Sequence, residues 1–208
     1  MLFIQHELQR TAQNLVADNI KNDEHVLIVS SSDQSKELID AIVSAASSTG
    51  AASVSAIIIA CPEDLKDYKH PPSVIASVEK ADLTIVATTL RFPRAYDDLS
   101  EALFKAGKRQ VLINNAPLED FTRGASLADP IKLNRRTHEL AEKISEGKMV
   151  RVKSENGTDL CVKVCRPCIA LTGRAEIDTG FGSFPSGEAM LSPEEFSAEG
   201  IFVADSFG

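Results

Sequence analysis

The segment HVLIVSSSDQSKELIDAIVSAASSTG, residues 25–50, decides the fold of this 208-residue chain. It opens with a short apolar run rich in β-branched residues, His25 to Ser30, which is typical of a buried strand. The Ser/Asp cluster 30–35 follows and supplies residues that cap a helix N-terminus. An amphipathic helix then extends through Ser48 and stops at Gly50, a residue favoured just after helices. Strand, capped turn and helix therefore form one structural unit.

This unit returns along the first half of the chain. The repeated elements are the apolar runs 54–61, 83–88 and 111–115 and the helical segments 72–80 and 95–106. Short apolar strands that alternate with helices predict a parallel sheet covered on both faces, because each crossover helix must return the chain to the same edge. With a further amphipathic helix expected over 2–20, residues 1–117 are predicted to form a small doubly wound α/β domain.

The pattern changes after residue 117. A helix is expected over 130–147, then a hairpin in which Asn156-Gly157 turns the chain between the runs 149–153 and 159–164. Glycine, serine and proline then separate short apolar pieces. Residues 118–208 are therefore predicted to form a β-rich α+β module that follows the doubly wound parallel sheet. The candidate buried residues of the helix are Ile131, Leu133, His138, Leu140, Ala141 and Ile144.

Composition and charge exclude several classes of function. The chain carries 22 Lys and Arg against 30 Asp and Glu, a net charge of −8, and its basic residues are scattered. Nucleic acid and anionic membranes are not expected partners, because both bind concentrated positive charge. The apolar runs are far shorter than the roughly 20 residues that span a bilayer, and the N-terminus lacks the pattern of a secretory signal. These features predict a cytoplasmic protein.

Two local motifs leave alternatives open. The spacing Cys161-x-x-x-Cys165-x-x-Cys168 is that of radical S-adenosylmethionine enzymes, but its first two cysteines fall in an alternating strand, which favours free thiols. The serine-rich turn 30–35 could hold a small anion at a helix N-terminus, with plain capping as the alternative. Dinucleotide, Walker and four-ligand zinc motifs are missing from the sequence. No cofactor is therefore expected.

The segment DTGFGSFPSGEAMLSPEEFSAEG, residues 178–200, is the strongest candidate for a site. Pro185-Ser186-Gly187 predicts a turn that presents Glu188 at the start of a short strand, with Phe181 and Phe184 on its approach. A carboxylate fixed by a turn beside aromatic surface can contact a ligand or bind a metal. An exposed loop acid is the alternative interpretation.

The stretch FPSGEAMLSPEEFSAEGIFVADSFG, residues 184–208, resembles a segment of the thermophilic metallo-aminopeptidases of the aminopeptidase T and S type. Their superfamily includes dihydroxypyridine ring-cleaving dioxygenases. The hairpin EGKMVRVKSENGTDLCVKV, residues 146–164, is similar to the family stretch around Gly157-Thr-Asp-Leu160. The resemblance assigns a metal-ligand role to Glu188 alone. It places the other ligands of both branches, which include two His and an Asp in the dioxygenases, in a C-terminal third beyond Gly208.

This apparent truncation leads to a first hypothesis. The chain would be a non-catalytic, peptide-binding pseudoenzyme that presents a peptide or peptide-like ligand to a separate modifying enzyme as a biosynthetic accessory. The aromatic rings would supply apolar contact, and Glu188 or Arg174 would fix a polar group. No catalytic residue is assigned, and no metal ligand except Glu188 if any. The predicted ligand-binding residues are Phe181, Phe184, Ser186, Gly187, Glu188, Arg174 and Phe202.

Two alternatives stay open. The first is a metal-dependent aminopeptidase or ring-cleaving dioxygenase completed by ligands from a partner or a missing segment. The second is a dimeric scaffold whose phenylalanine-rich end forms the interface. A homodimer is expected from the habit of the family and from the strand edge that truncation would uncover.

Overall fold

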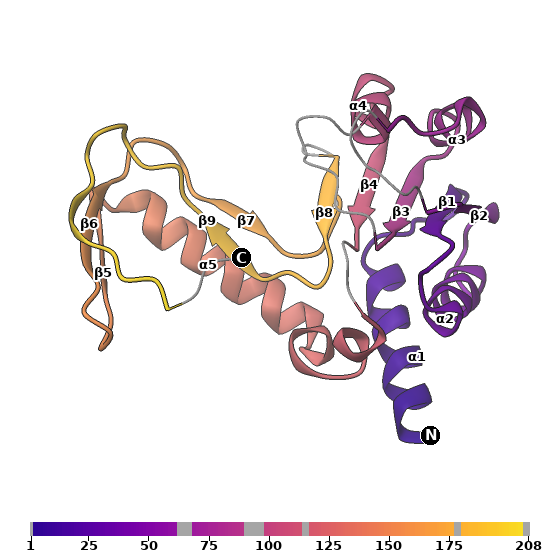
Figure 1. Cartoon of the computed structure of the whole chain (residues 1–208), viewed down its shortest axis with the longest axis horizontal. Helices are drawn as coiled ribbons and strands as arrows, with labels where there is room; N and C mark the ends of the chain where they lie inside the picture. The colour runs from indigo at the N-terminus through magenta and orange to yellow at the C-terminus, as the bar shows by residue number, and fades with distance from the viewer. Residues whose placement is uncertain (1, 62–67, 90–97, 114–116, 177–179, 206–208) are drawn as a thin grey trace. The chain divides into compact units, whose positions relative to one another are not determined.

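The computed structural model of the chain describes residues 2–61, 68–89, 98–113, 117–176 and 180–205 (Figure 1). The chain divides into two compact units, and each consists of two segments. Unit 1 comprises residues 1–130 and 172–186, and unit 2 comprises 131–171 and 187–208. The first segment of unit 1 thus runs past residue 117 to residue 130, and the segment 172–186 joins it. The predicted α/β class is confirmed. None of the described helices has the length and apolar character needed to cross a bilayer.

A parallel sheet of five strands, counted among the described residues, forms the centre of unit 1. In spatial order the strands are β2 (Ser53–Ile59), β1 (His25–Ser31), β3 (Leu83–Ala87), β4 (Arg109–Leu112) and β8 (Phe181–Ser183). Val26 of β1 is in register with both Val54 and Leu83. The chain passes from β1 to β2 on one side and then crosses to β3 on the other. The strand order therefore reverses between β1 and β3.

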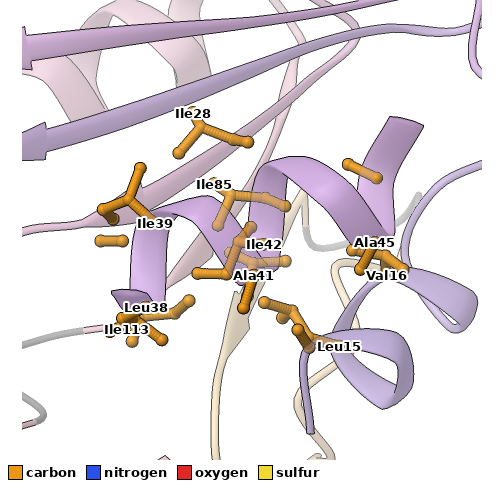
Figure 2. Packing of buried hydrophobic residues seen from close by; sticks show 14 of the residues in the cluster. Leu15, Val16, Ile28, Leu38, Ile39, Ala41, Ile42, Ala45, Ile85 and Ile113 are labelled. Atoms are coloured by element: carbon orange, nitrogen blue, oxygen red, sulfur yellow. The ribbon is translucent and has the colours of Figure 1, made fainter. Parts of the chain in front are cut away.

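Helices cover both faces of this sheet, as the sequence predicts. They are α1 (Leu2–Ala17), α2 (Lys36–Ser47), α3 (Pro72–Val78) and α4 (Asp98–Lys105). Ile28 and Ile85 pack with α1 and α2 (Figure 2). Leu27 and Val29 pack with α3 and α4. Residues 95–97 of the expected fourth helix and 114–115 of the expected fourth strand lie outside the described residues.

The side chains between sheet and helices supply most of the apolar burial in unit 1. Leu38 and Ile42 of α2 are fully buried, as is Phe121 of the short 3-10 helix η2 (Leu118–Phe121), which η3 (Gly124–Leu127) follows. Each such side chain stabilises the fold by about 1.5–3 kcal/mol relative to exposure. Ser35 caps α2 as expected, because its Oγ accepts a hydrogen bond from the Leu38 N–H at 3.3 Å.

The returning segment 172–186 is fixed to unit 1 by a buried polar cluster. The Asn19 side chain donates to the Gly173 carbonyl at 3.1 Å and accepts from the Ala175 N–H at 2.8 Å. Arg109 donates to the carbonyls of Asn19 and Ala175 at 3.0 and 3.3 Å. Gly182 lets the backbone of Arg174 and Ala175 pass close to β8, because a Cβ at position 182 would lie only 2.7–2.9 Å from their backbone atoms. These contacts place β8 beside β4.

The described residues of unit 2 form one long helix and two small antiparallel sheets. The helix is α5 (Pro130–Glu146), and the strands are β5 (Met149–Lys153), β6 (Asp159–Lys163), β7 (Ile169–Leu171), β9 (Glu188–Met190) and β10 (Glu199–Ile201). The described strands pair in the orders β10-β6-β5 and β7-β9. The predicted helix and hairpin are both present.

The described part of unit 2 lacks an apolar core of its own. Its buried residues are Thr137, Ala141 and Thr158, whereas both apolar clusters belong to unit 1. Among the residues expected to be buried on α5, Ile131 and Leu140 are 74% and 51% exposed, and His138 is also exposed. That expectation is wrong for these three, because no described part of unit 2 covers them.

Candidate functional site

The predicted turn lies where the chain leaves unit 1 and enters unit 2. Glu188 is the first residue of β9, is exposed, and pairs with Leu171 of β7. Gly187 lies against α5, since a Cβ at this position would come within 2.5 Å of Leu133 Cδ1. Phe202 belongs to the same unit and is 70% exposed. Unit 2 therefore carries three of the predicted site residues.

The other predicted site residues belong to unit 1. Phe181 packs against the core beneath α3 and α4, and the Phe184 ring lies 6.0 Å from the Phe121 ring, against the core on the opposite face. Arg174 pairs with Asp18 at 2.6 Å, and Ser186 is buried. The two phenylalanines are half-buried and pack against the cores of unit 1. Their presence is therefore explained by the fold without a ligand.

Metal donors do not converge in the part of the chain that the structure describes. It contains no group of three or more His, Cys, Asp or Glu side chains placed to hold one ion. His25 hydrogen-bonds Ser53 at 2.8 Å, His70 hydrogen-bonds Asp98 at 2.6 Å, and His138 lies on α5 in unit 2. Non-haem iron typically needs two His and one carboxylate on one side of the metal. The described residues do not fit that requirement.

A chain of hydrogen bonds joins the carboxyl ends of β1 and β3. The Thr89 N–H donates to Ser31 Oγ at 3.0 Å, and the two hydroxyl oxygens lie 3.1 Å apart. The Thr89 hydroxyl in turn reaches both carboxylate oxygens of Asp33 at 2.6–2.7 Å. Hydrogen bonds from Thr89 and Ser31 hold the pKa of Asp33 below its ordinary value, so this exposed carboxylate is ionised at neutral pH.

Three further titratable features lie near these hydrogen bonds: the Cys61 thiol, the Tyr68 hydroxyl, and the pair formed by His70 and Asp98. Partial desolvation and then the charge of Asp33 raise the pKa of the Cys61 thiol. Desolvation and then the charge of Asp98 raise the pKa of Tyr68. His70 is nearly fully buried, with its Nδ1 2.6 Å from Asp98 and its ring edge-on to Tyr68 at 5.3 Å. The cluster therefore combines an ionised carboxylate with neutral donors.

This polar cluster is better placed to contact a ligand than the predicted site residues of unit 1, which pack against the core, form an ion pair or are buried. Open α/β sheets bind ligands outside the carboxyl ends of their strands, where the strand order reverses. The ionised Asp33 disfavours the small anion considered at the serine-rich turn and favours a neutral or cationic polar group. Sequence reasoning missed Thr89 and Cys61 in this role. Part of the signal was available, since Thr89 follows the predicted strand 83–88 and Cys61 ends the predicted strand 54–61, but the pairing of the two strand ends was not.

Comparison with known proteins decides the family. The sequence profile of NicX, 2,5-dihydroxypyridine 5,6-dioxygenase, matches residues 7–206. This chain belongs to that family. No curated protein matches the sequence. The superfamily link predicted from residues 146–164 and 184–208 is therefore confirmed.

Two solved structures share the fold of this family member. The 2,5-dihydroxypyridine dioxygenase from Pseudomonas putida KT2440 is 19% identical, with a TM-score of 0.67, and the match covers 94% of this chain and 58% of that one. AmpT from Thermus thermophilus is 13% identical, with a TM-score of 0.57, and the match covers 94% of this chain and 63% of that one. The chain thus spans about three fifths of the length of each.

The family match corrects the first functional hypothesis. The non-catalytic peptide-binding protein was inferred from the single donor Glu188 and from exposed phenylalanines, and that interpretation is wrong. A match over residues 7–206 and a dioxygenase with the same fold point instead to the ring-cleaving alternative. The physical reason for the error is that metal donors missing from one stretch of chain do not reveal whether another polypeptide supplies them.

Proposed function

We propose that this chain is part of a metal-dependent dioxygenase that opens the ring of a dihydroxylated pyridine or a similar hydroxylated aromatic compound. The family match over residues 7–206 is the observation that carries this proposal. The shared fold of the Pseudomonas putida dioxygenase supports it, because that likeness extends over 94% of the chain.

The metal ligands of this reaction come, in our proposal, from polypeptide other than the described residues. The sequence resemblance implies iron held by two His and an Asp, and the described residues bring no such set together. The chain spans only 58% of the dioxygenase with the same fold. A further segment or a partner subunit would therefore complete the site.

The apolar surface of unit 2 supports a completing polypeptide. Of the exposed large apolar residues in the described chain, all but Ile58 and Phe104 belong to unit 2. They are Ile131, Leu140, Met149, Val152, Ile169, Met190, Phe196, Ile201 and Phe202. So much exposed apolar surface usually marks an interface, and small units need buried apolar area to be stable.

A second copy of the chain is one polypeptide that would bury the exposed apolar residues of unit 2. Light scattering of the purified protein tests it, with Phe202→Asp in unit 2 and Phe104→Asp, which is 83% exposed in α4, as matched control. A homodimer that Phe202→Asp alone dissociates would support a second copy. If the unmodified chain is monomeric, a different subunit or segment must bury this surface. We also propose a cytoplasmic location, because none of the four cysteines, all of which the structure describes, takes part in a disulfide.

Oxygen labelling tests the proposed reaction. The tagged chain is purified without oxygen from cells that make it naturally, so that any completing polypeptide accompanies it, and is then given 2,5-dihydroxypyridine and ¹⁸O₂. Both atoms of one O₂ are expected in each ring-opened product, with oxygen uptake equal to substrate loss. Loss of 2,5-dihydroxypyridine without oxygen uptake, or no loss of 2,5-dihydroxypyridine at all, would overturn the proposal.

A further inference from the structure

Two cysteines of unit 2 are separated by only two residues and lie outside every function discussed above. Cys165-Arg-Pro-Cys168 connects Val164, next to β6, with Ile169 at the start of β7. Both thiols are free. Cys165 is exposed and Cys168 is half-buried. The four residues belong to no strand ladder, so their local geometry is not fixed by sheet pairing.

We propose that Cys165 and Cys168 form a dithiol site that exchanges with small disulfides and closes to an intramolecular disulfide. A disulfide needs Cα atoms about 4.4–6.8 Å apart, whereas three fully extended residue steps would span about 10 Å. The chain changes direction at Arg166, which shortens that span. Arg166 and Pro167 are exposed, so closing the remaining distance displaces no buried side chain.

The surroundings of the two sulfurs favour this pair over the other cysteines. The exposed Cys165 thiol donates a hydrogen bond of 3.7 Å to the Ser192 carbonyl, which it gives up when it reacts. The backbone N–H of Cys168 is held by Ser145 Oγ at 2.8 Å, which fixes its place beside α5 while its thiol stays free. Cys161 instead lies inside β6, paired on both sides with β5 and β10. Cys61 lies in unit 1 beside Asp33 and has a raised pKa.

The exchange reaction balances with oxidised glutathione as the oxidant. The Cys165 thiolate attacks one glutathione sulfur, a protein–glutathione disulfide forms, and one glutathione leaves as thiolate. The Cys168 thiolate then attacks the Cys165 sulfur and releases the second glutathione. Two protein thiols are oxidised and one glutathione disulfide is reduced to two thiols. The two protons lost by the cysteines end on the two glutathione sulfurs, so no net proton is released.

Closure of this disulfide would reshape a groove in unit 2. Pro167, Cys168 and Ala170 line a hollow of about 460 Å³ against Ala141 and Ser145 of α5. Because Cys168 lines this groove, oxidation of the pair would change the shape of the groove. The site is independent of the proposed ring-cleaving chemistry, because no step of that chemistry uses these residues.

Peptide mass analysis tests the dithiol site on the full chain. After equilibration in glutathione buffers, free thiols are alkylated and the protein is digested with trypsin. Both cysteines fall in the single peptide 164–174, because trypsin does not cut between Arg166 and Pro167. Oxidation is expected to remove both alkylation sites together and to lower the peptide mass by two hydrogens, while Cys61 stays alkylated.

Serine variants make the result decisive. Cys165→Ser is expected to leave Cys168 as a persistent glutathione adduct or a free thiol, and Cys61→Ser, the matched control, is expected to close the disulfide like the parent. The proposal is overturned if Cys61 oxidises first or if Cys165 pairs with Cys161. It is equally overturned if both cysteines of the parent protein carry separate glutathione adducts.

Discussion

Arg109 joins three separate parts of unit 1 through one guanidinium group. Its Nη2 donates to both carboxylate oxygens of Glu24 at 2.6 Å, and its Nη1 donates to the carbonyls of Asn19 and Ala175. Arg109→Ala removes this donor from the buried carbonyls of Asn19 and Ala175, and leaves the partly buried Glu24 with the Lys21 N–H at 2.9 Å but without its cationic partner. We expect a loss of about 3–5 kcal/mol in the free energy of unfolding, measured with urea.

The control for this variant is an exposed ion pair on α5. Arg135 pairs with Glu139 at 3.6 Å with both side chains largely in solvent. Arg135→Ala is expected to change the free energy of unfolding by no more than about 0.5 kcal/mol, because exposed pairs of this kind contribute little. Equal losses for the two variants would refute the role given to Arg109.

Asp159 predicts a pH dependence in the hairpin of unit 2. Hydrogen bonds from Arg151 at 2.7 and 2.8 Å, assisted by Lys153, lower its pKa from 3.8 to about 2. Since the folded pKa is the lower one, this ion pair contributes stability above pH 3.8 and loses it as the pH falls toward 2. Carboxyl NMR should show this pKa, and Arg151→Gln should return it toward 3.8. An unchanged pKa in the variant would contradict the assignment.

At the scale of single elements, β8 depends on a glycine. A Cβ at position 182 would lie 2.7–2.9 Å from backbone atoms of Arg174 and Ala175, which cannot move without disturbing the Asn19 hydrogen bonds. Gly182→Ala is expected to cost about 1–3 kcal/mol of unfolding free energy, as overpacking does. Ser183→Ala in the same strand is the control. If both variants unfold at the same urea concentration, the strand does not need this close approach.

The sequence predicts the other strands of this sheet but not β8. The apolar runs that became β1 and β3 are continuous and β-branched, because their side chains are buried on both faces. Phe181-Gly-Ser183 holds a single large apolar residue, so no periodicity marks it. Its place depends on pairing with β4 and on Ala175, in the segment before it, which hydrogen-bonds to Asn19 and Arg109 far away in the sequence.

At the scale of the whole molecule, the two units are expected to differ in stability. Unit 1 contains both apolar cores, and the described part of unit 2 has only Thr137, Ala141 and Thr158 buried. Amides of α5 and β5 should therefore exchange with solvent faster than amides of β1 and β3 in the isolated chain. Hydrogen exchange resolved by peptide measures this. Equal protection in both units would show that unit 2 is stabilised in a way the burial pattern does not reveal.

The sequence predicts the family of the whole molecule better than its chemistry. The motif around Glu188 identified the superfamily, and its position at the start of β9 agrees with the expected turn and strand. The polar cluster at Asp33 and Thr89 was missed, because it forms only when β1 and β3 become neighbours. The reaction was misjudged because the single donor Glu188 was taken as evidence against the dioxygenase branch, whereas the family match supports that branch.

Iron binding tests most directly the proposal that a further segment or a partner subunit completes the metal site. The purified 208-residue chain and the assembly isolated with its natural partners are each dialysed against ferrous iron without oxygen, and bound iron is counted per chain. The isolated chain is predicted to retain no stoichiometric iron, whereas the assembly retains it. Stoichiometric iron on the isolated chain that Glu188→Gln or His70→Asn removes would contradict the proposal.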